Sequence, residues 1–248
     1  MLRKRIIPVI LLDGYSVVKT IQFHTRRNLG NPIAVARIYN SRNIDELVLL
    51  DIDAAKDKRQ IDYFTIQDIA SECFMPLTVG GGLENCKSIE KALKKGADKV
   101  VLNTEALKHP AFISEAAAEF GSQCVIISVD VKLGAKDYEV YSHSGLEKLP
   151  ALNDWCRQIE ELGAGEIFLN SVDRDGLMSG YDLDLVRRVS DLVKIPVIAC
   201  GGAGEPEDTR KAISSGASAA AAASLFHFTS FTPEDCRAAL RGSFIPVR

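Results

Sequence analysis

The sequence has little of what marks secreted, metal-binding or membrane proteins. Its six cysteines form no Cys-x-x-Cys pair and mostly lie inside apolar runs, which favours buried free thiols over disulfides or a metal site. The apolar stretch near the start breaks at Asp13-Gly14 without a small-residue cleavage site, so we expect a first strand there and not a signal peptide. No apolar run reaches membrane-spanning length.

An excess of one charge is also absent, because the net charge is only −3. Such a balance gives no general electrostatic attraction to nucleic acid or to an anionic membrane. Together these absences predict a cytoplasmic protein in a reducing compartment, with no nucleic-acid or membrane partner and no metal or other cofactor.

One pattern occurs twice in the chain. Residues 195–204 read Ile-Pro-Val-Ile-Ala-Cys-Gly-Gly-Ala-Gly, and residues 75–82 repeat the proline, the apolar run and the glycines. A short apolar run closed by glycines is typical of a buried parallel strand. Glycines let the backbone approach an anion closely, and the helix that follows offers free N–H groups. The two copies predict two phosphate sites; tight turns between strand and helix are the alternative.

Apolar runs and helical segments alternate along the whole chain. Strands are expected at residues 6–12, 46–53, 76–79, 99–103, 124–129, 166–170 and 195–200, and in the alanine-rich run that follows the turn at Gly216 and ends at Ser224. Helices are expected at residues 32–40, 63–72, 88–95, 111–120, 154–162, 184–193, 208–214 and 233–240. Residues 17–30 are polar, which predicts a long loop, and residues 132–144 indicate a hairpin-like insertion.

Eight strand–helix units without a linker favour an α/β fold, namely one closed (β/α)₈ TIM barrel over residues 1–248. An open doubly wound sheet would need about five or six strands and a single switch point. Leu11 matches Asp130, and Asn103 matches Ser224, at a common spacing of about half a chain. We therefore expect a duplicated half-barrel with a pseudo-twofold site for a substrate that carries phosphate at each end.

In such a barrel the chemistry lies at the C-terminal ends of the strands. The residues expected there are Asp13, Asp51, Asp53, Gly80 to Gly82, Asn103, Thr104, Asp130, Lys132, Asn170, Asp173, Asp175, Gly176, Cys200 to Gly204 and Ser224. Asp130 ends a buried strand, which favours an acid or base, with a helix cap or a loop ion pair as the alternative. Asp175-Gly176 is either a ligand site or a plain turn pair.

Four charged residues stand at the opposite ends of the strands: Arg5, Glu46, Lys99 and Glu166. They either flank their strands independently or converge on the barrel axis as a ring of alternating sign. The residues alone favour the first interpretation.

Motifs along the whole chain resemble the cyclase subunit of imidazole glycerol phosphate synthase. They are Met1-Leu-Arg-Lys-Arg-Ile-Ile, Asp45-Glu-Leu-Val-Leu-Leu-Asp51-Ile-Asp-Ala, Thr78-Val-Gly-Gly-Gly82, Gly96-Ala-Asp-Lys-Val100, Phe120-Gly-Ser-Gln123, Asp173-Arg-Asp-Gly176 and Gly201-Gly-Ala-Gly204. The resemblance implies a (β/α)₈ barrel that forms a heterodimer with a glutaminase subunit. It also implies that ammonia from that partner passes through the barrel core to a phosphorylated small-molecule substrate on the far face. The product is imidazole glycerol phosphate, in histidine synthesis.

The resemblance also implies roles for individual residues. Lys19 corresponds to a lysine of the family's mobile first loop. It is expected to bind substrate or phosphate, together with Asp51, Gly82, Asn103, Thr104, Asp175, Gly176, Gly202, Ala223 and Ser224. The resemblance implies that four residues form a gate at the ammonia entrance: Arg5, Glu46, Lys99 and Glu166. This replaces the interpretation of them as independent strand-flanking charges.

One departure concerns the two aspartates that the family uses as acid and base. Asp130 matches the second, but Leu11 stands where the first should be. Losing a general acid or base typically costs about 10²–10⁴ in rate, or roughly 3–5 kcal/mol of barrier. Asp13 lies about 6–7 Å further along an extended strand, so it should not replace the missing group. Asn170 and Cys200 also stand where small hydroxyl residues are expected.

This pattern resembles a second-copy paralogue found in sugar-modification clusters of bacterial surface polysaccharides. The resemblance implies that the barrel and its glutaminase supply ammonia to a separate sugar amidotransferase, which makes an acetamidino group. We therefore expect such a divergent subunit first. An authentic histidine-pathway cyclase and a non-catalytic scaffold are the alternatives.

Overall fold

Eight parallel strands close into a barrel in the computed structural model, which describes residues 3–247. These strands are β1 (Arg5–Asp13), β4 (Leu47–Asp51), β5 (Leu77–Gly80), β6 (Lys99–Leu102), β7 (Val125–Leu133), β9 (Glu166–Ser171), β10 (Val197–Cys200) and β11 (Ala219–Ala222). Each pairs with the next, and β11 pairs with β1 through Ala219 opposite Arg5, which closes the sheet. The (β/α)₈ barrel that the sequence predicts is confirmed.

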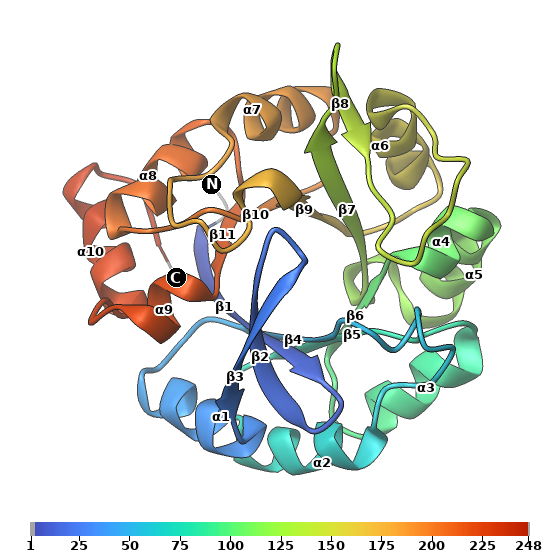
Figure 1. Ribbon diagram of the computed structural model, residues 1–248, viewed down its shortest axis with the longest axis horizontal. Helices are drawn as coiled ribbons and strands as arrows, with labels where there is room; N and C mark the ends of the chain where they lie inside the picture. Colours follow the sequence, from blue (N-terminus) through green and yellow to red (C-terminus); the bar gives the residue numbers. More distant parts are fainter. Residues whose placement is uncertain (1–2, 248) are drawn as a thin grey trace.

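Helices surround the barrel, as Figure 1 shows. They are α1 (Pro32–Ser41), α2 (Tyr63–Glu72), α3 (Cys86–Lys94), α4 (Thr104–Lys108), α5 (Ala111–Phe120), α6 (Leu152–Glu161), α7 (Leu183–Leu192), α8 (Pro206–Ser214), α9 (Ser224–Phe228) and α10 (Pro233–Gly242), with 3₁₀ turns η1 (Ser122–Cys124) and η2 (Val172–Arg174). Side-chain caps from Asn31, Asp62 and Asp182 fix where α1, α2 and α7 begin. Gly96 follows α3 with φ of 105°, a backbone conformation that ends a helix readily.

The two halves of the chain build equivalent parts of the barrel. β6 and β11 are each followed by a five-residue helix, α4 and α9, which the sequence analysis did not predict. The residues before these helices, Asn103 and Ala223, have similar backbone angles, with φ/ψ of −138°/−83° and −121°/−66°. The two positions lie about half a chain apart. This agreement supports the expected duplication, but it matches Asn103 with Ala223, one residue away from the predicted match with Ser224.

Apolar side chains form two layers, one on each side of the strands. The larger layer lies between strands and helices, and contains Cys124, Cys156 and Cys236 as free thiols, as the sequence predicts. The smaller layer fills the barrel interior with Ile7, Val9, Val48, Val101, Ile126, Phe168, Ile198, Ala219 and Ala221. This inner layer separates the floor, where the barrel strands begin, from the mouth, where they end.

The structure corrects the prediction for residues 17–30. They are not a loop: β2 (Ser16–Ile21) and β3 (Thr25–Gly30) form an antiparallel hairpin that lies over the mouth in Figure 1. β2 continues the sheet from the end of β1, with Val18 opposite Leu11. The prediction was wrong because it relied on polar composition, while β3 keeps its polar side chains exposed. The insertion at 132–144 is a hairpin as predicted, in which β8 (Tyr138–Val140) pairs with β7.

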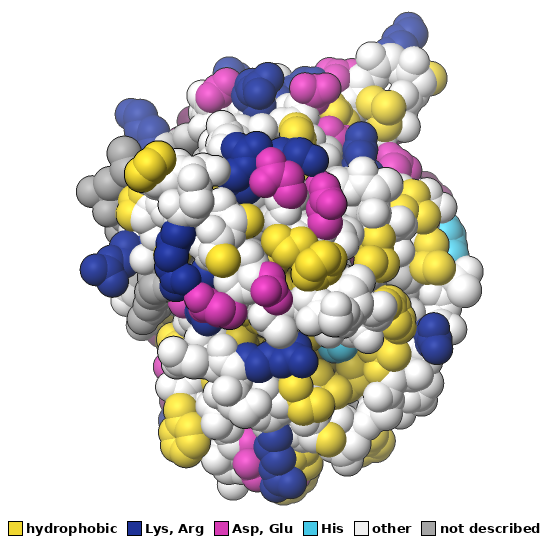
Figure 2. Space-filling model, turned by 90° about the vertical axis from the view of Figure 1, so that its left-hand side faces the viewer, with side chains coloured by type: hydrophobic (Ala, Val, Ile, Leu, Met, Phe, Trp, Pro, Cys, Tyr) yellow, Lys and Arg dark blue, Asp and Glu magenta, His cyan; other side chains and the backbone are white. Residues whose placement is uncertain are grey.

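The distribution of charged side chains on the outer surface agrees with the small net charge. Basic and acidic side chains are interspersed on the side shown in Figure 2. Within residues 3–247, the helices are too short or too polar for any of them to cross a membrane.

Candidate active site

A cavity opens at the mouth of the barrel. Its lining includes every residue that the sequence analysis assigned to substrate or phosphate binding: Lys19, Asp51, Gly82, Asn103, Thr104, Asp175, Gly176, Gly202, Ala223 and Ser224. Asp130 and Leu11 also line it. The structure therefore brings these residues together, and their individual roles stay predictions. Some residues that were expected at the strand ends do not line the cavity: Asp13, Asp53, Gly80, Lys132, Asp173 and Gly204.

Two glycine turns lie on opposite sides of this mouth, since β5 and β10 are four strands apart in the closed order. A Cβ at Gly82 would lie 2.3 Å from the nearest backbone oxygen, and a Cβ at Gly202 would lie 2.2 Å from one. Neither position can carry a side chain without a shift of the backbone. Beside these turns, Thr104 and Ser224 open short helices whose first N–H groups have no partner within the helix. Glycine turns of this kind, with free N–H groups beside them, are suited to binding anions.

Asp130 lies on β7 at the mouth and is only 9% exposed. Asn103 Nδ2 donates to its Oδ2 at 2.9 Å, and Ser128 Oγ donates to its Oδ1 at 3.3 Å. Burial raises the pKa of Asp130 to about 7, although hydrogen bonds from Ser128, Asn103 and Asn170 favour the carboxylate. A carboxyl group with a pKa near neutrality can both donate and accept a proton at physiological pH.

The raised pKa of Asp130 has a consequence for stability. Between about pH 4 and pH 7 the folded chain holds a proton that the unfolded chain has lost, so stability falls as the pH rises. Asp130→Asn removes this ionisation. We expect the variant to gain stability over the wild type across this range, by up to about 4 kcal/mol above pH 7. Urea unfolding at pH 4.5 and pH 8 measures the difference, and an equal difference at both pH values would contradict the raised pKa.

Leu11 lies across the barrel from Asp130. β1 and β7 are four strands apart in the closed order, so their ends face each other over the mouth. Leu11 packs against the inner apolar layer and lines the cavity. The side of the mouth that faces Asp130 therefore presents methyl groups where the resemblance places an aspartate.

Three other carboxylates near the mouth, Asp13, Asp51 and Asp175, pair with cationic side chains. Asp13 accepts a hydrogen bond from an arginine of β3 at 2.8 Å and does not line the cavity. Asp51 accepts two hydrogen bonds from Arg59, at 2.5 and 2.7 Å. Asp175 pairs with Lys19 at 2.9 Å. Each of these three carboxylates therefore has a cationic partner, although the arginine beside Asp13 also pairs with Asp53.

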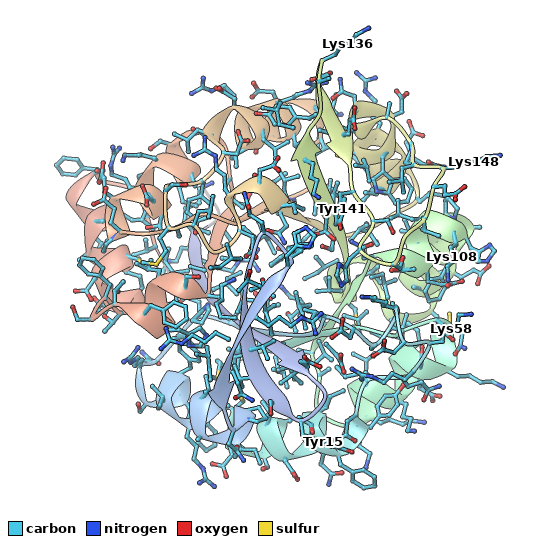
Figure 3. All side chains as sticks on the ribbon, viewed as in Figure 1. Tyr15, Lys58, Lys108, Lys136, Tyr141 and Lys148 are labelled. Carbon is cyan, nitrogen blue, oxygen red and sulfur yellow. The ribbon has the colours of Figure 1, made fainter. Side chains whose placement is uncertain are left out.

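The β2–β3 hairpin covers the cavity. Lys19 is only 4% exposed, and its Nζ donates to Asp175 on the loop after β9. At the hairpin tip, Phe23 contacts Tyr141 edge to face, with ring centroids 6.0 Å apart. Figure 3 labels Tyr141 beside this tip. The residue that resembles the family's mobile-loop lysine thus contacts the loop after β9, on another side of the mouth.

The floor carries a ring of ion pairs. Arg5 donates to Glu46 at 2.7 Å and also to Glu166, while Lys99 donates to Glu166 at 2.7 Å and to Glu46 at 3.3 Å. Burial acts to raise the pKa of Glu166, but hydrogen bonds and positive charge from Arg5 and Lys99 hold it below its usual value. The four charges converge, so their interpretation as independent strand-flanking charges is wrong. Their function as a gate stays a prediction.

Sequence reasoning missed two residues that hold these groups in place. Thr78 is fully buried, and its Oγ1 donates to Glu46 at 2.7 Å. Its pairing opposite Lys99, on the inward face of the next strand, is the signal that could have identified it. Arg59, which holds Asp51, lies in a loop and gives no such signal.

The chain has relatives along its whole length. The model of a family described as histidine biosynthesis protein matches residues 5–232. A protein of Campylobacter jejuni subsp. jejuni, provisionally named imidazole glycerol phosphate synthase subunit hisF2, is 45% identical over 249 residues, which cover 100% of this chain and 99% of the relative. Imidazole glycerol phosphate synthase subunit HisF from Alkaliphilus metalliredigens is 48% identical over 92% of both chains, and that from Thermobifida fusca is 42% identical over 98% of both. The chain therefore belongs to the histidine biosynthesis protein family, as a HisF-like subunit of the imidazole glycerol phosphate synthase type.

Proposed function

We propose that this chain pairs with a glutaminase subunit, conducts ammonia through its barrel, and supplies that ammonia to a separate enzyme that amidinates a surface-polysaccharide sugar. The observation that carries the proposal is the difference between the two ends of the barrel. The ion-pair ring at the floor is complete, whereas Leu11 faces Asp130 across the mouth. The complete ring lets ammonia enter the barrel. With only one residue of the acid–base pair at the mouth, the chain uses little of that ammonia itself, and the rest leaves for another enzyme.

The apolar barrel interior favours passage of an uncharged molecule over an ion. Above the ring, the lining is apolar from Ile7 and Val48 to Phe168, with the small side chains of Ala219 and Ala221 on β11. An ammonium ion would lose its hydration there at a cost of several kcal/mol, whereas neutral ammonia loses much less. The interior therefore supports passage of ammonia and exclusion of ions.

The geometry of the ring is consistent with a gate that opens when one side chain, Lys99, moves. Lys99 is the most exposed of the four, with 20% of its side chain accessible, and its contacts with Glu46 are longer than those of Arg5. If Lys99 withdraws, Arg5 still contacts both carboxylates. The ring then opens on one side while each carboxylate keeps a contact with Arg5.

The alternative is an authentic cyclase of histidine biosynthesis. The glycine turns on both sides of the mouth and the pKa of Asp130, raised to about 7, favour it. This alternative requires another group to do the work of the missing aspartate. Asp13, the nearest candidate in sequence, pairs with Arg26 outside the cavity. We therefore prefer the ammonia-supplying function.

Pairing is tested with a purified glutaminase subunit of imidazole glycerol phosphate synthase. We expect this chain to raise its rate of glutamine hydrolysis well above the rate of the isolated glutaminase. Leu11→Asn changes only the mouth, so it should activate the glutaminase as the wild type does. Hydrolysis at the same rate with and without this chain would rule out the proposed pairing.

A further inference from the structure

One buried acceptor at the mouth has no partner. Asn170 Oδ1 is buried and accepts no hydrogen bond from the described residues. A buried acceptor without a donor costs free energy, so a ligand that donates an N–H or O–H group is favoured there. Asn170 is among the residues that line the mouth cavity, so its buried oxygen lies next to a space that a small ligand can enter.

The unpartnered oxygen stands beside a second acceptor. β7 and β9 pair in parallel, with Asp130 opposite Asn170. The carboxyl of Asp130 is held in place by Asn103 Nδ2 at 2.9 Å and Ser128 Oγ at 3.3 Å. The side chain of Asn170 also donates a hydrogen bond to this carboxyl through its amide N–H. The amide oxygen, on the same planar group, therefore lies near the carboxyl oxygens on this side of the mouth.

The surrounding backbone limits how a donor reaches Asn170. A Cβ at Gly201 would lie 2.9 Å from Asn170 Oδ1, so the turn after β10 lies close to the oxygen on that side. On β9, Asn170 shares the inward face with Phe168 of the apolar layer and Glu166 of the floor ring. Along this strand, Asn170 is the first polar side chain above the apolar interior.

We infer that Asn170 Oδ1 and the Asp130 carboxyl form a reception site for ammonia where it leaves the apolar interior. The inference rests on the proposed conduction of ammonia and adds the residues that receive it. Ammonia has three N–H groups, so one molecule can donate to the amide oxygen and to a carboxyl oxygen at once. Its protonated form, ammonium, pairs with the carboxylate and favours that state of Asp130.

The test follows the Asp130 carboxyl carbon by NMR in the full chain labelled with ¹³C-aspartate, using Asp130→Asn to assign the signal. Titration with ammonium chloride is compared with potassium chloride at equal ionic strength. We expect a saturable shift with ammonium only, and ionisation of Asp130 at a lower pH in ammonium than in potassium. Equal effects of the two salts would mean that water alone occupies the acceptor, and the inference would fail.

Three variants separate this site from a general effect on folding. Asn170→Leu removes the acceptor and should weaken the apparent affinity for ammonium about tenfold or more. Asn170→Thr restores an acceptor oxygen and should recover part of the affinity for ammonium. Ser190→Ala, which removes another buried unpartnered oxygen, on α7 and away from the cavity, should change nothing. Wild-type affinity in Asn170→Leu would overturn the inference.

The two proposals can fail separately. An ammonium-specific shift without activation of the glutaminase would contradict the pairing and keep the binding site. Activation of the glutaminase without the shift would contradict the binding site and keep the proposed function.

Discussion

Leu11→Asp is expected to raise the rate of cyclisation by about 10²–10⁴, the usual contribution of a general acid or base. The variant places a carboxylate at the end of β1, across the mouth from Asp130. Leu11 is partly exposed to the cavity, so the new charge stays close to water and its burial cost is limited. The measurement is formation of imidazole glycerol phosphate from the two-phosphate ribonucleotide substrate with saturating ammonium salt. The salt bypasses the glutaminase and the floor ring.

The matched control is Leu11→Asn, which has the size and polarity of aspartate but no ionisable group. We expect it to turn over at the wild-type rate. If asparagine and aspartate raise the rate equally, the gain comes from polarity and not from acid–base chemistry. If neither raises it, the missing carboxylate is not what limits cyclisation in this chain.

Arg5→Met is expected to lower the free energy of unfolding by about 3–5 kcal/mol, the usual cost of breaking a buried ion pair from one side. Arg5 contacts both Glu46 and Glu166, whose side chains are only 2% and 10% exposed. Without it, two nearly buried carboxylates share Lys99 alone. Urea unfolding at pH 7 measures the loss.

Two further variants show whether that loss comes from the ring. Arg210→Met breaks an ion pair with Glu207 on the surface of α8, and should cost less than about 1 kcal/mol. Glu166→Gln added to Arg5→Met removes one uncompensated charge and should recover part of the stability. The floor would not be a coupled ring if Arg5→Met cost no more than Arg210→Met.

The barrel could be predicted because each of its strands is a short apolar run with a clear end. Val197–Cys200 ends at glycines, and β1 ends at Asp13-Gly14. The hairpin over the mouth could not be predicted in this way. Lys19 and Thr20 on β2 are polar yet buried, because both contact Asp175, which is far away in the sequence. Composition along the chain does not contain such contacts.

In the candidate site too, local sequence patterns predict some residues, while others depend on contacts between distant parts of the chain. The rule that chemistry lies at strand ends identifies Asp130 and both glycine turns from the sequence. Convergence of the floor charges depends on closure of the barrel, with β11 paired to β1, which the residues alone do not fix. The unpartnered oxygen of Asn170 depends on the paired strands beside it, so only coordinates reveal it.

The most direct test of the central claim is the ratio of imidazole glycerol phosphate formed to glutamine hydrolysed by the wild-type heterodimer. A barrel that conducts ammonia but lacks half of the acid–base pair should hydrolyse glutamine and form less than about one product molecule per hundred glutamines. Formation of one product for each glutamine would contradict the claim that ammonia passes through this barrel unused.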